Sequence, residues 1–304
     1  MRLVIALGGN ALGGGETPRA ERERRLAVTS VELADLICAG HEIVVTHGNG
    51  PQVGELMLDQ ESRSGDDERG ERLPLDVLVA MTQAELGYRL QRALGRELAE
   101  RGRPRPVVSL VTQVVVDRDD PAFGNPTKPV GPGYLHRPDD GRPYVRQNDR
   151  WRRVVASPEP RKVVERRALV AMLDAEVVPI CAGGGGVPVA PDEAGRYWGV
   201  EAVVDKDLTS ALVADSIGAD GLLILTDVDR VARHHGTPQA EPLDTLTVDE
   251  ADAMVADGDA ASGSMGPKLR AASRVARGGG IAVITRLGTA VDALAGRSGT
   301  RIVT

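Results

Sequence analysis

Short runs of aliphatic and β-branched residues alternate with longer stretches of helical periodicity along the whole chain. The short runs are apolar nearly throughout, as in the strands of a parallel sheet that is buried on both faces. The predicted strands are residues 2–7, 42–46, 107–116, 177–181, 222–225, 281–285 and 301–303. The predicted helices are residues 18–39, 51–62, 74–101, 160–174, 206–217, 247–256, 267–277 and 289–295. This alternation predicts an α/β fold, a three-layer αβα sandwich.

Residues 117–155 interrupt the alternation with a stretch rich in Asp, Pro, Gly and Arg that has no sustained period. A structureless loop of that length is uncommon inside a compact domain. The stretch also contains Phe123, Tyr134, Tyr144 and Trp151, whereas disordered segments are usually poor in aromatic residues. We therefore expect a small folded flap that closes over a site.

Composition narrows the classes of function. The net charge of −7 argues against a nucleic-acid partner held by bulk charge. The longest apolar runs have the length of strands, so no membrane span is predicted. The start, MRLVIALGG, is too short for a signal peptide, and the protein is expected to be cytoplasmic. Cys38 and Cys181 lie in apolar stretches and are predicted to be buried free thiols.

Lysine is rare in this chain. Of the 37 basic residues, 33 are Arg and only four are Lys. Lys128, Lys206 and Lys268 fall in Gly-, Pro- or Asp-rich segments that look like loops, whereas Lys162 falls in a predicted amphipathic helix and is interpreted as a surface residue. A lysine ammonium is a compact point charge, unlike the planar fork of arginine. The first three lysines therefore suit a site that stabilises a moving phosphoryl group, with chance placement on the surface as the alternative.

Glycine-rich turns follow three of the predicted strands. They are Gly8-Gly9-Asn10, Gly48-Asn49-Gly50 and the run from Gly183 through Gly184 to Gly186. Ligands of open α/β sheets bind beyond the C-terminal ends of the strands, and glycine allows backbone N–H groups to approach an anion closely. Tight turns between strands and helices need glycine anyway, but three such turns at one sheet edge predict an extended anionic ligand.

The segment GSMGPK, residues 263–268, resembles a further anion-binding loop. Pro267 suits the first turn of a helix, so Met265, Gly266 and Lys268 would present amides and one ammonium group to a phosphate. Helix initiation by Gly-Pro is the structural alternative.

Two acidic segments are also candidates. Asp227 and Asp229 follow the predicted strand 222–225 and could bind a ribose or Mg²⁺. Asp205 and Asp207 flank Lys206 at the start of a predicted helix. Asp207 either holds the lysines in place or caps the helix.

Several common motifs are missing. The spacing G-x-G-x-x-G and the P-loop sequence Gly-Lys-Ser/Thr do not occur. The five histidines show no metal-ligand spacing, and there is no G-x-S-x-G nucleophile motif. Phosphoryl transfer to an anionic acceptor needs no nucleophilic side chain, because positioning and charge stabilisation supply most of the catalysis.

Taken together, these segments resemble the carbamate kinases of the amino-acid-kinase superfamily. The similarity covers almost the whole chain, and the most specific motifs are THGNGPQVG and NPTKPVGP, whereas GSMGPK resembles a wider superfamily signature. The remaining matching segments are ALGGNAL, PLDV, AMTQ, LVTQVVVDRDDPAFG, WRRVVASPEP, AGGGGVPV, GVEAVVDKDL and LTDVD. One departure is Gly133, where relatives often carry an aromatic residue.

The resemblance implies a roughly eight-stranded, mainly parallel sheet with a small protruding subdomain at 117–155, usually in a homodimer. One continuous sheet would join an acceptor-binding lobe at 1–190 to a nucleotide-binding lobe at 191–304. The substrates would be ATP or ADP with carbamate or carbamoyl phosphate, and Mg²⁺ would arrive with the nucleotide rather than at a protein metal site. No nucleic-acid or membrane partner is expected.

The resemblance also implies residue roles at the matching positions. Lys128, Lys206 and Lys268 would stabilise charge on the phosphates, with Lys128 reaching in from the flap and Asp207 orienting lysines. Gly8, Gly9 and Asn10 would face the transferring phosphoryl group. The carbamate side would include Gly48, Asn49, Gly183 and Gly184. The nucleotide side would include Thr226, Asp227, Met265, Gly266 and Lys268.

The expected reaction is direct in-line transfer between carbamate and the γ-phosphorus of Mg-ATP. Because carbamoyl phosphate has a high transfer potential, the useful direction would be ATP formation, as in arginine catabolism. Two alternatives keep the fold: a kinase for another small carboxylate or phosphate, and a nucleotide-binding regulatory module without turnover.

Overall fold

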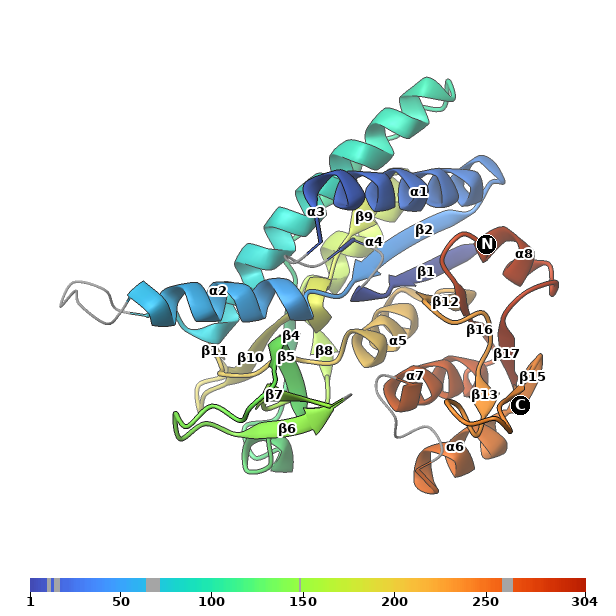
Figure 1. Cartoon of the computed structure of the whole chain (residues 1–304). Coiled ribbons are helices and arrows are strands. Elements are labelled where there is room, and N and C mark those ends of the chain that lie inside the picture. The colour runs from blue at the N-terminus through green and yellow to red at the C-terminus, as the bar shows by residue number, and fades with distance from the viewer. Residues whose placement is uncertain (10–11, 14–16, 64–71, 148, 259–264) are drawn as a thin grey trace.

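A computed structural model describes the chain except residues 10–11, 14–16, 64–71, 148 and 259–264. A central sheet of eight strands runs through the molecule (Figure 1). From one edge to the other the strands are β15 (Thr245–Thr247), β17 (Thr300–Val303), β16 (Ile281–Arg286), β12 (Gly221–Thr226), β1 (Arg2–Leu7), β2 (Glu42–His47), β9 (Val178–Ile180) and β3 (Val107–Ser109). Among the described residues of this sheet, only the pairing of β16 with β17 is antiparallel. The predicted, mainly parallel sheet is confirmed.

Helices cover both faces of this sheet (Figure 1). One face carries α1 (Arg19–Cys38), α3 (Leu75–Glu100) and α8 (Ala290–Leu294), and the other carries α4 (Arg166–Asp174), α5 (Lys206–Ile217), α6 (Val248–Ala256) and α7 (Met265–Arg277). The alternation of side chains along β1 divides the core accordingly. Leu3, Ile5 and Leu7 pack with α1 and α3, whereas Val4 and Ala6 pack with α5 and α7. The three-layer αβα sandwich is therefore confirmed.

The longest helix, α3, shows why these segments become helices. Leu86, Leu90, Leu94 and Leu98 repeat every four residues and are buried against the sheet. This spacing places them on one face of a helix of 3.6 residues per turn. Within the described residues, no helix is both long and apolar enough to cross a membrane.

The prediction of one strand over residues 107–116 was wrong, because this segment forms two strands, β3 and β4. After β3 the chain leaves the main sheet, passes through Thr112 and enters β4 (Gln113–Val115) of a second sheet. Thr112 is buried, and its backbone N–H donates to Gln83 of α3 instead of continuing a strand ladder. The second sheet has the order β11 (Tyr197–Gly199), β10 (Val187–Pro191), β4 and β8 (Lys162–Val163).

Three further local predictions were wrong. Lys162 lies in strand β8 rather than in a helix, because Val163 pairs with Val114 and is buried while Lys162 faces solvent. Helix α7 begins at Met265, two residues before the predicted start at residue 267, so Pro267 lies in its first turn but is not its first residue. Cys38 is exposed at the end of α1, whereas Cys181 is buried as predicted. A short hairpin of β13 (Ala232–Arg233) and β14 (Glu241–Pro242) was not predicted.

The expected flap is a folded subdomain. It contains the 3₁₀ turn Pro121–Phe123 and a three-stranded antiparallel sheet of β5 (Lys128–Tyr134), β7 (Arg150–Val155) and β6 (Tyr144–Gln147). Tyr134 and Tyr144 meet edge to face, with ring centroids 6.1 Å apart. The flap projects below α2 (Gly50–Arg63) in Figure 1.

The flap contacts α2 through two glycines with no side chains between them. A Cβ atom on Gly54 of α2 would lie 2.0 Å from the Cα atom of Gly131 in β5. Gly131 has a φ of +69° and lies where the pairing of β5 with β7 shifts register. The position of the flap therefore depends on a close approach of two backbones.

We expect Gly54→Ala to destabilise the protein by about 1 to 3 kcal/mol, since the added methyl group overlaps backbone that cannot rotate away. Urea unfolding measures this change. Gly95→Ala in α3 is the matched control, because a Cβ atom there meets nothing within 4 Å, and it should be neutral or stabilising by about 1 kcal/mol. Equal stability of the two variants would contradict the close contact.

Candidate active site

A cavity of about 280 Å³ lies where the C-terminal ends of β1, β2 and β12 meet the flap. This is the edge of the sheet at which open α/β folds bind ligands. The turns after the strands contribute Gly8, Gly9, Gly48, Asn49 and Gly184 to its lining. The charged and hydroxyl groups predicted from the sequence contribute Lys128, Lys206, Asp207, Lys268, Thr226 and Asp227. Segments from both halves of the chain therefore form one cavity.

The glycine turns allow backbones to approach one another at this edge. A Cβ atom on Gly48 would lie 3.2 Å from the Cα atom of Gly9, so the turns after β2 and β1 are in contact. Gly184 has a φ of +66°, and a Cβ atom there would lie 2.1 Å from the Asn49 side chain. Any larger residue at these two positions would displace the floor of the cavity.

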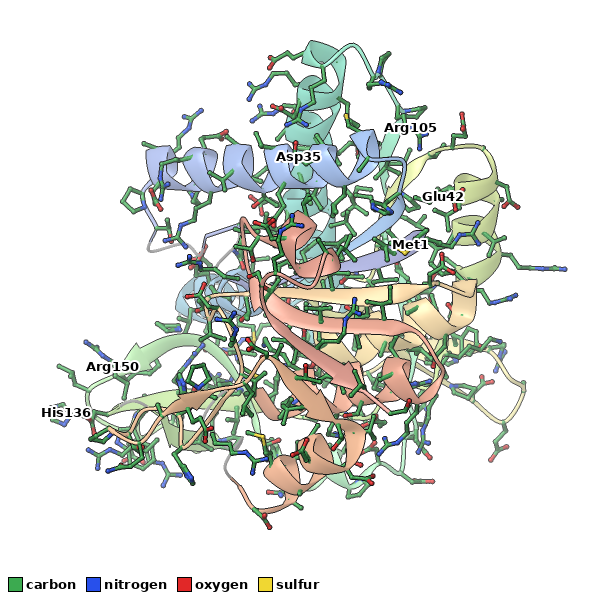
Figure 2. All side chains as sticks on the ribbon, turned by 90° about the vertical axis from the view of Figure 1, so that its right-hand side faces the viewer. Met1, Asp35, Glu42, Arg105, His136 and Arg150 are labelled. Atoms are coloured by element: carbon green, nitrogen blue, oxygen red, sulfur yellow. The ribbon has the colours of Figure 1, made fainter. Side chains whose placement is uncertain are left out.

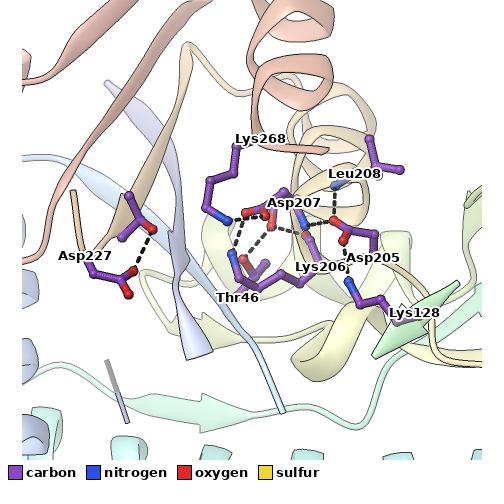
Figure 3. A network of polar contacts seen from close by, with 10 residues as sticks. Thr46, Lys128, Asp205, Lys206, Asp207, Leu208, Asp227 and Lys268 are labelled. Atoms are coloured by element: carbon purple, nitrogen blue, oxygen red, sulfur yellow. Dashed lines mark hydrogen bonds and ion pairs between the residues drawn. The ribbon is translucent and has the colours of Figure 1, made fainter. Parts of the chain in front are cut away.

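Two of the lysines share one buried carboxylate (Figure 3). Asp207, in the first turn of α5, accepts from the ammonium group of Lys206 and, at 3.2 Å, from that of Lys268 in α7. Asp207 is only 2% exposed and Lys268 only 3%. A carboxylate between two buried cations offsets their mutual repulsion and fixes both ammonium groups.

The third lysine arrives from the flap. Lys128, at the start of β5, forms an ion pair with Asp205. Asp205 is also the N-cap of α5, because its Oδ1 accepts from the backbone N–H groups of Asp207 at 2.8 Å and Leu208 at 3.4 Å. Of the two roles open to Asp207 in the sequence, capping belongs to Asp205.

Burial and ion pairing have opposite effects on the pKa values of this cluster. Burial lowers the pKa of Lys206, and Asp207 opposes that shift. Burial alone would raise the pKa of Asp205, but Lys128 and Lys206 more than offset it, so the pKa of Asp205 lies well below its ordinary value. Asp205 is therefore ionised at neutral pH.

Comparison with known proteins identifies the family of this chain. A sequence profile of the amino acid kinase family matches residues 1–285. The chain is 44% identical to a carbamate kinase of Thermococcus kodakarensis, over 99% of each chain. It is 43% identical to the carbamate kinase-like protein YqeA of Escherichia coli, over 99% of this chain and 98% of that protein.

Solved structures give the same result. The carbamate kinase of Giardia lamblia bound to citric acid superposes with a TM-score of 0.90 at 37% identity, and the same enzyme bound to AMP-PNP with a TM-score of 0.88 at 36% identity. Each comparison covers 99% of this chain and 98% of the other. The chain belongs to the amino acid kinase family, among the carbamate kinases.

The other residues predicted for the acceptor side differ in whether they line the cavity. Asn49 is buried, and its amide donates to Thr82 at 2.8 Å. Gly183 lies behind Gly184 and packs on the buried ring of His47 rather than lining the cavity. Asn10 lies outside the described residues.

Of the four residues predicted only for the nucleotide side, two line the cavity and two do not. Thr226 and Asp227 line the cavity, and the Thr226 hydroxyl donates to Asp227 at 3.0 Å. Figure 3 places Asp227 on the side of the lysine cluster opposite Lys128. Met265 packs against the core, and neither it nor Gly266 lines the cavity.

Sequence reasoning missed two charged residues that line the cavity. Asp205 was seen only as a neighbour of Lys206, although a cap at the start of a predicted helix was a usable signal. Arg152 of β7 also lines the cavity. It stands among many arginines in the sequence, so only the structure distinguishes it.

A larger hollow of about 780 Å³ lies between α1 and α8. Its buried carboxylate, Glu32, accepts from the backbone N–H groups of Gly288 and Ala290 at 2.9 and 2.7 Å. None of the four lysines and none of the three predicted glycine turns lines it. Its volume is therefore not a reason to place the chemistry there.

The buried His47 makes the stability of this kinase depend on pH. Burial lowers the pKa of His47 from 6.5 to about 4, so its ring is neutral at pH 7. Between these two values the unfolded chain binds the proton and the folded chain does not, so the free energy of unfolding falls as the pH falls from 6.5 towards 4. The full shift corresponds to about 3 kcal/mol.

We expect His47→Gln to weaken this acid dependence, because glutamine has no proton to bind. Urea unfolding at several pH values between 7 and 4.5 gives the slope. The exposed His136, on the outer flap (Figure 2), provides a control through His136→Gln, which should keep the wild-type slope. An unchanged slope in His47→Gln would show that other groups cause the acid sensitivity.

Proposed function

We propose that this chain is a carbamate kinase, which transfers a phosphoryl group reversibly between ATP and carbamate to give ADP and carbamoyl phosphate. One observation carries the proposal. Three of the four lysines, from the flap, α5 and α7, converge on one glycine-lined cavity in a chain that is 44% identical to a carbamate kinase. The fourth, Lys162, lies outside that cavity and is exposed.

The cavity suits a reaction between anions. A carbamate oxygen attacks the γ-phosphorus of ATP, the bond to the β–γ bridging oxygen breaks, and ADP leaves with that electron pair. Carbamate is already an anion, so no residue needs to remove a proton from it. Positioned ammonium groups stabilise the charge on the equatorial and bridging oxygens of the transition state.

The two ends of the cavity suit the two substrates. We place carbamate at Gly48 and Asn49, in the lobe at 1–190, beneath the flap. We place the nucleotide at Thr226 and Asp227, in the lobe at 191–304. Lys206 and Lys268, held by Asp207 between these ends, would contact the phosphoryl group in transit.

Mg²⁺ would enter as part of the substrate Mg-ATP. The cavity carboxylates Asp205 and Asp207 are already paired with lysines. In the described part of the chain, no group of three or more His, Cys, Asp or Glu residues could hold a metal ion. These residues fit a metal ion that arrives on the nucleotide phosphates, with Asp227 as the exposed carboxylate at that end.

The test is ATP formation from carbamoyl phosphate, ADP and Mg²⁺, which is also the direction that we propose for the cell. Lys128→Ala should lower kcat by about two or more decades, the range for removing a preorganised charge-stabilising group. Lys162→Ala is the matched control and should keep wild-type kcat. Equal activity of the two variants would contradict the role of Lys128.

Acetyl phosphate and other acyl phosphates should be assayed in parallel. ATP formed from one of them, but not from carbamoyl phosphate, would identify the protein as a kinase of another small anion. Tight ADP binding without ATP from any donor would identify a nucleotide-binding module instead.

We also propose that the protein is a cytoplasmic homodimer that joins through α3 and β3. β3 is an edge strand of the main sheet, and such edges are prone to pair with another chain. Gly87 of α3 lies against Ser109 of β3, so this helix flanks the edge. Met81 and Tyr88 on α3 and Val111 beyond β3 are 44%, 59% and 46% exposed, an apolar surface that a partner would cover.

Sedimentation equilibrium tests the dimer. We expect the wild type to have twice the mass of the 32.1 kDa chain. The double substitution Met81→Asp and Tyr88→Asp should shift the protein to the monomer mass. In the dimer, the new carboxylates would be buried in the interface without a cation to pair with. A wild-type monomer, or a variant that remains dimeric, would rule out this interface.

A further inference from the structure

Among the described residues, Arg152 is the one arginine that lines the catalytic cavity. It lies on β7 of the flap, next to β5, which carries Lys128. Its side chain is half-buried. The flap therefore brings two cations of different shape to one site, a point charge from Lys128 and a planar fork from Arg152.

Each of the three lysines of the cavity is paired with a carboxylate, whereas Arg152 is not, in the part of the chain that the structure describes. Lys128 is paired with Asp205, and Lys206 and Lys268 share Asp207. Across the described residues, no carboxylate forms an ion pair with Arg152, and its buried Nε has no hydrogen-bond partner. Burial lowers the pKa of Arg152, and no nearby carboxylate counteracts that shift.

The neighbouring arginines of β7 do not share this situation. Arg153 forms an ion pair with Glu61 of α2 at 2.5 Å. Arg150 is exposed on the outer flap (Figure 2), and its Nη1 donates to the carbonyl oxygen of Gly133 at 3.4 Å. Arg152 alone on this strand reaches the cavity, and a partly buried cation without a counter-ion is costly unless an anion binds to it.

We propose that Arg152 is a substrate-binding residue, whose guanidinium binds the acceptor anion, carbamate or carbamoyl phosphate, together with Lys128. This inference rests on the proposed function. The guanidinium fork matches the paired oxygens of a carboxylate or phosphate. The flap packs on α2 at the carbamate end of the cavity, whereas Thr226 and Asp227 lie at the end of β12, so Arg152 contacts the acceptor and not the nucleotide.

A purely structural role is the competing explanation. Nη2 of Arg152 donates to the carbonyl oxygen of Gly131 at 2.7 Å, in the irregular part of β5 that contacts α2. A residue that only holds this backbone needs a hydrogen-bond donor and no charge. Arg152→Gln keeps a donor and loses the charge, whereas Arg152→Lys keeps the charge and loses the fork. These two variants separate the roles.

The experiment measures kcat and the KM values for carbamoyl phosphate and ADP in Arg152→Gln, Arg152→Lys and the matched control Arg150→Gln. We expect Arg152→Gln to raise the KM for carbamoyl phosphate by about ten- to hundredfold, the range for losing a hydrogen bond to a charged group. The KM for ADP should stay within about twofold of wild type. The KM of Arg152→Lys for carbamoyl phosphate should lie between those of the wild type and Arg152→Gln. Arg150→Gln should have the wild-type KM values.

Calorimetric titration with phosphonoacetamide, a stable analogue of carbamoyl phosphate, adds a readout without turnover. Its affinity should fall in Arg152→Gln in parallel with the KM. An unchanged KM and affinity would overturn the proposal, and so would equal rises in both KM values with a lowered melting temperature. If the wild type forms no ATP, the proposed function fails, and an unchanged affinity in Arg152→Gln is then the result that rejects the role of Arg152.

Discussion

The arrangement of this site depends on one carboxylate that lies between two buried ammonium groups. Without Asp207, Lys206 and Lys268 would be two like charges in a poorly solvated place, and the cheapest response would be loss of a proton. A neutral lysine would lack the charge that the proposed phosphoryl transfer requires. Because Asp207 lies in the first turn of α5 and accepts from Lys268 of α7, it also links these two helices.

The same helix start serves the flap. Asp205 uses one oxygen to cap α5 and the other to receive Lys128, so the beginning of one helix connects three parts of the molecule. Lys128, Lys206 and Lys268 are far apart in the sequence, yet the ammonium groups of all three contact the carboxylate of Asp205 or Asp207. The cluster therefore forms only when α5, α7 and the flap are in place.

Much of the fold followed from pattern. The continuous apolar runs identified seven of the eight strands of the main sheet, because strands covered on both faces need apolar residues at every position. The eighth, β15, has no such run and was missed. The same reasoning failed at Thr112 and Lys162, where strands change sheets and pair over only two or three residues. Such short ladders are set by tertiary contacts and not by the local β-propensity of the sequence. One such contact is the Gln83 side chain, which accepts a hydrogen bond from the backbone N–H of Thr112.

The site was foreseeable where composition was unusual and hidden where it was ordinary. Four lysines among 33 arginines drew notice to Lys128, Lys206 and Lys268, and the structure brings them together. Arg152 offers no such contrast, since Arg150, Arg152 and Arg153 look alike until their partners are known. The division of labour between Asp205 and Asp207 also needed coordinates, because both positions can cap a helix.

The scarcity of lysine has a practical consequence for the chemistry of this surface. Most proteins carry many primary amines, and reagents that acylate or alkylate amines label them indiscriminately. Here such a reagent meets the N-terminus, the exposed Lys162 and three amines inside a single cavity. Protection of those three against a small amine reagent would therefore report occupancy of the cavity directly, with almost no background from the rest of the molecule.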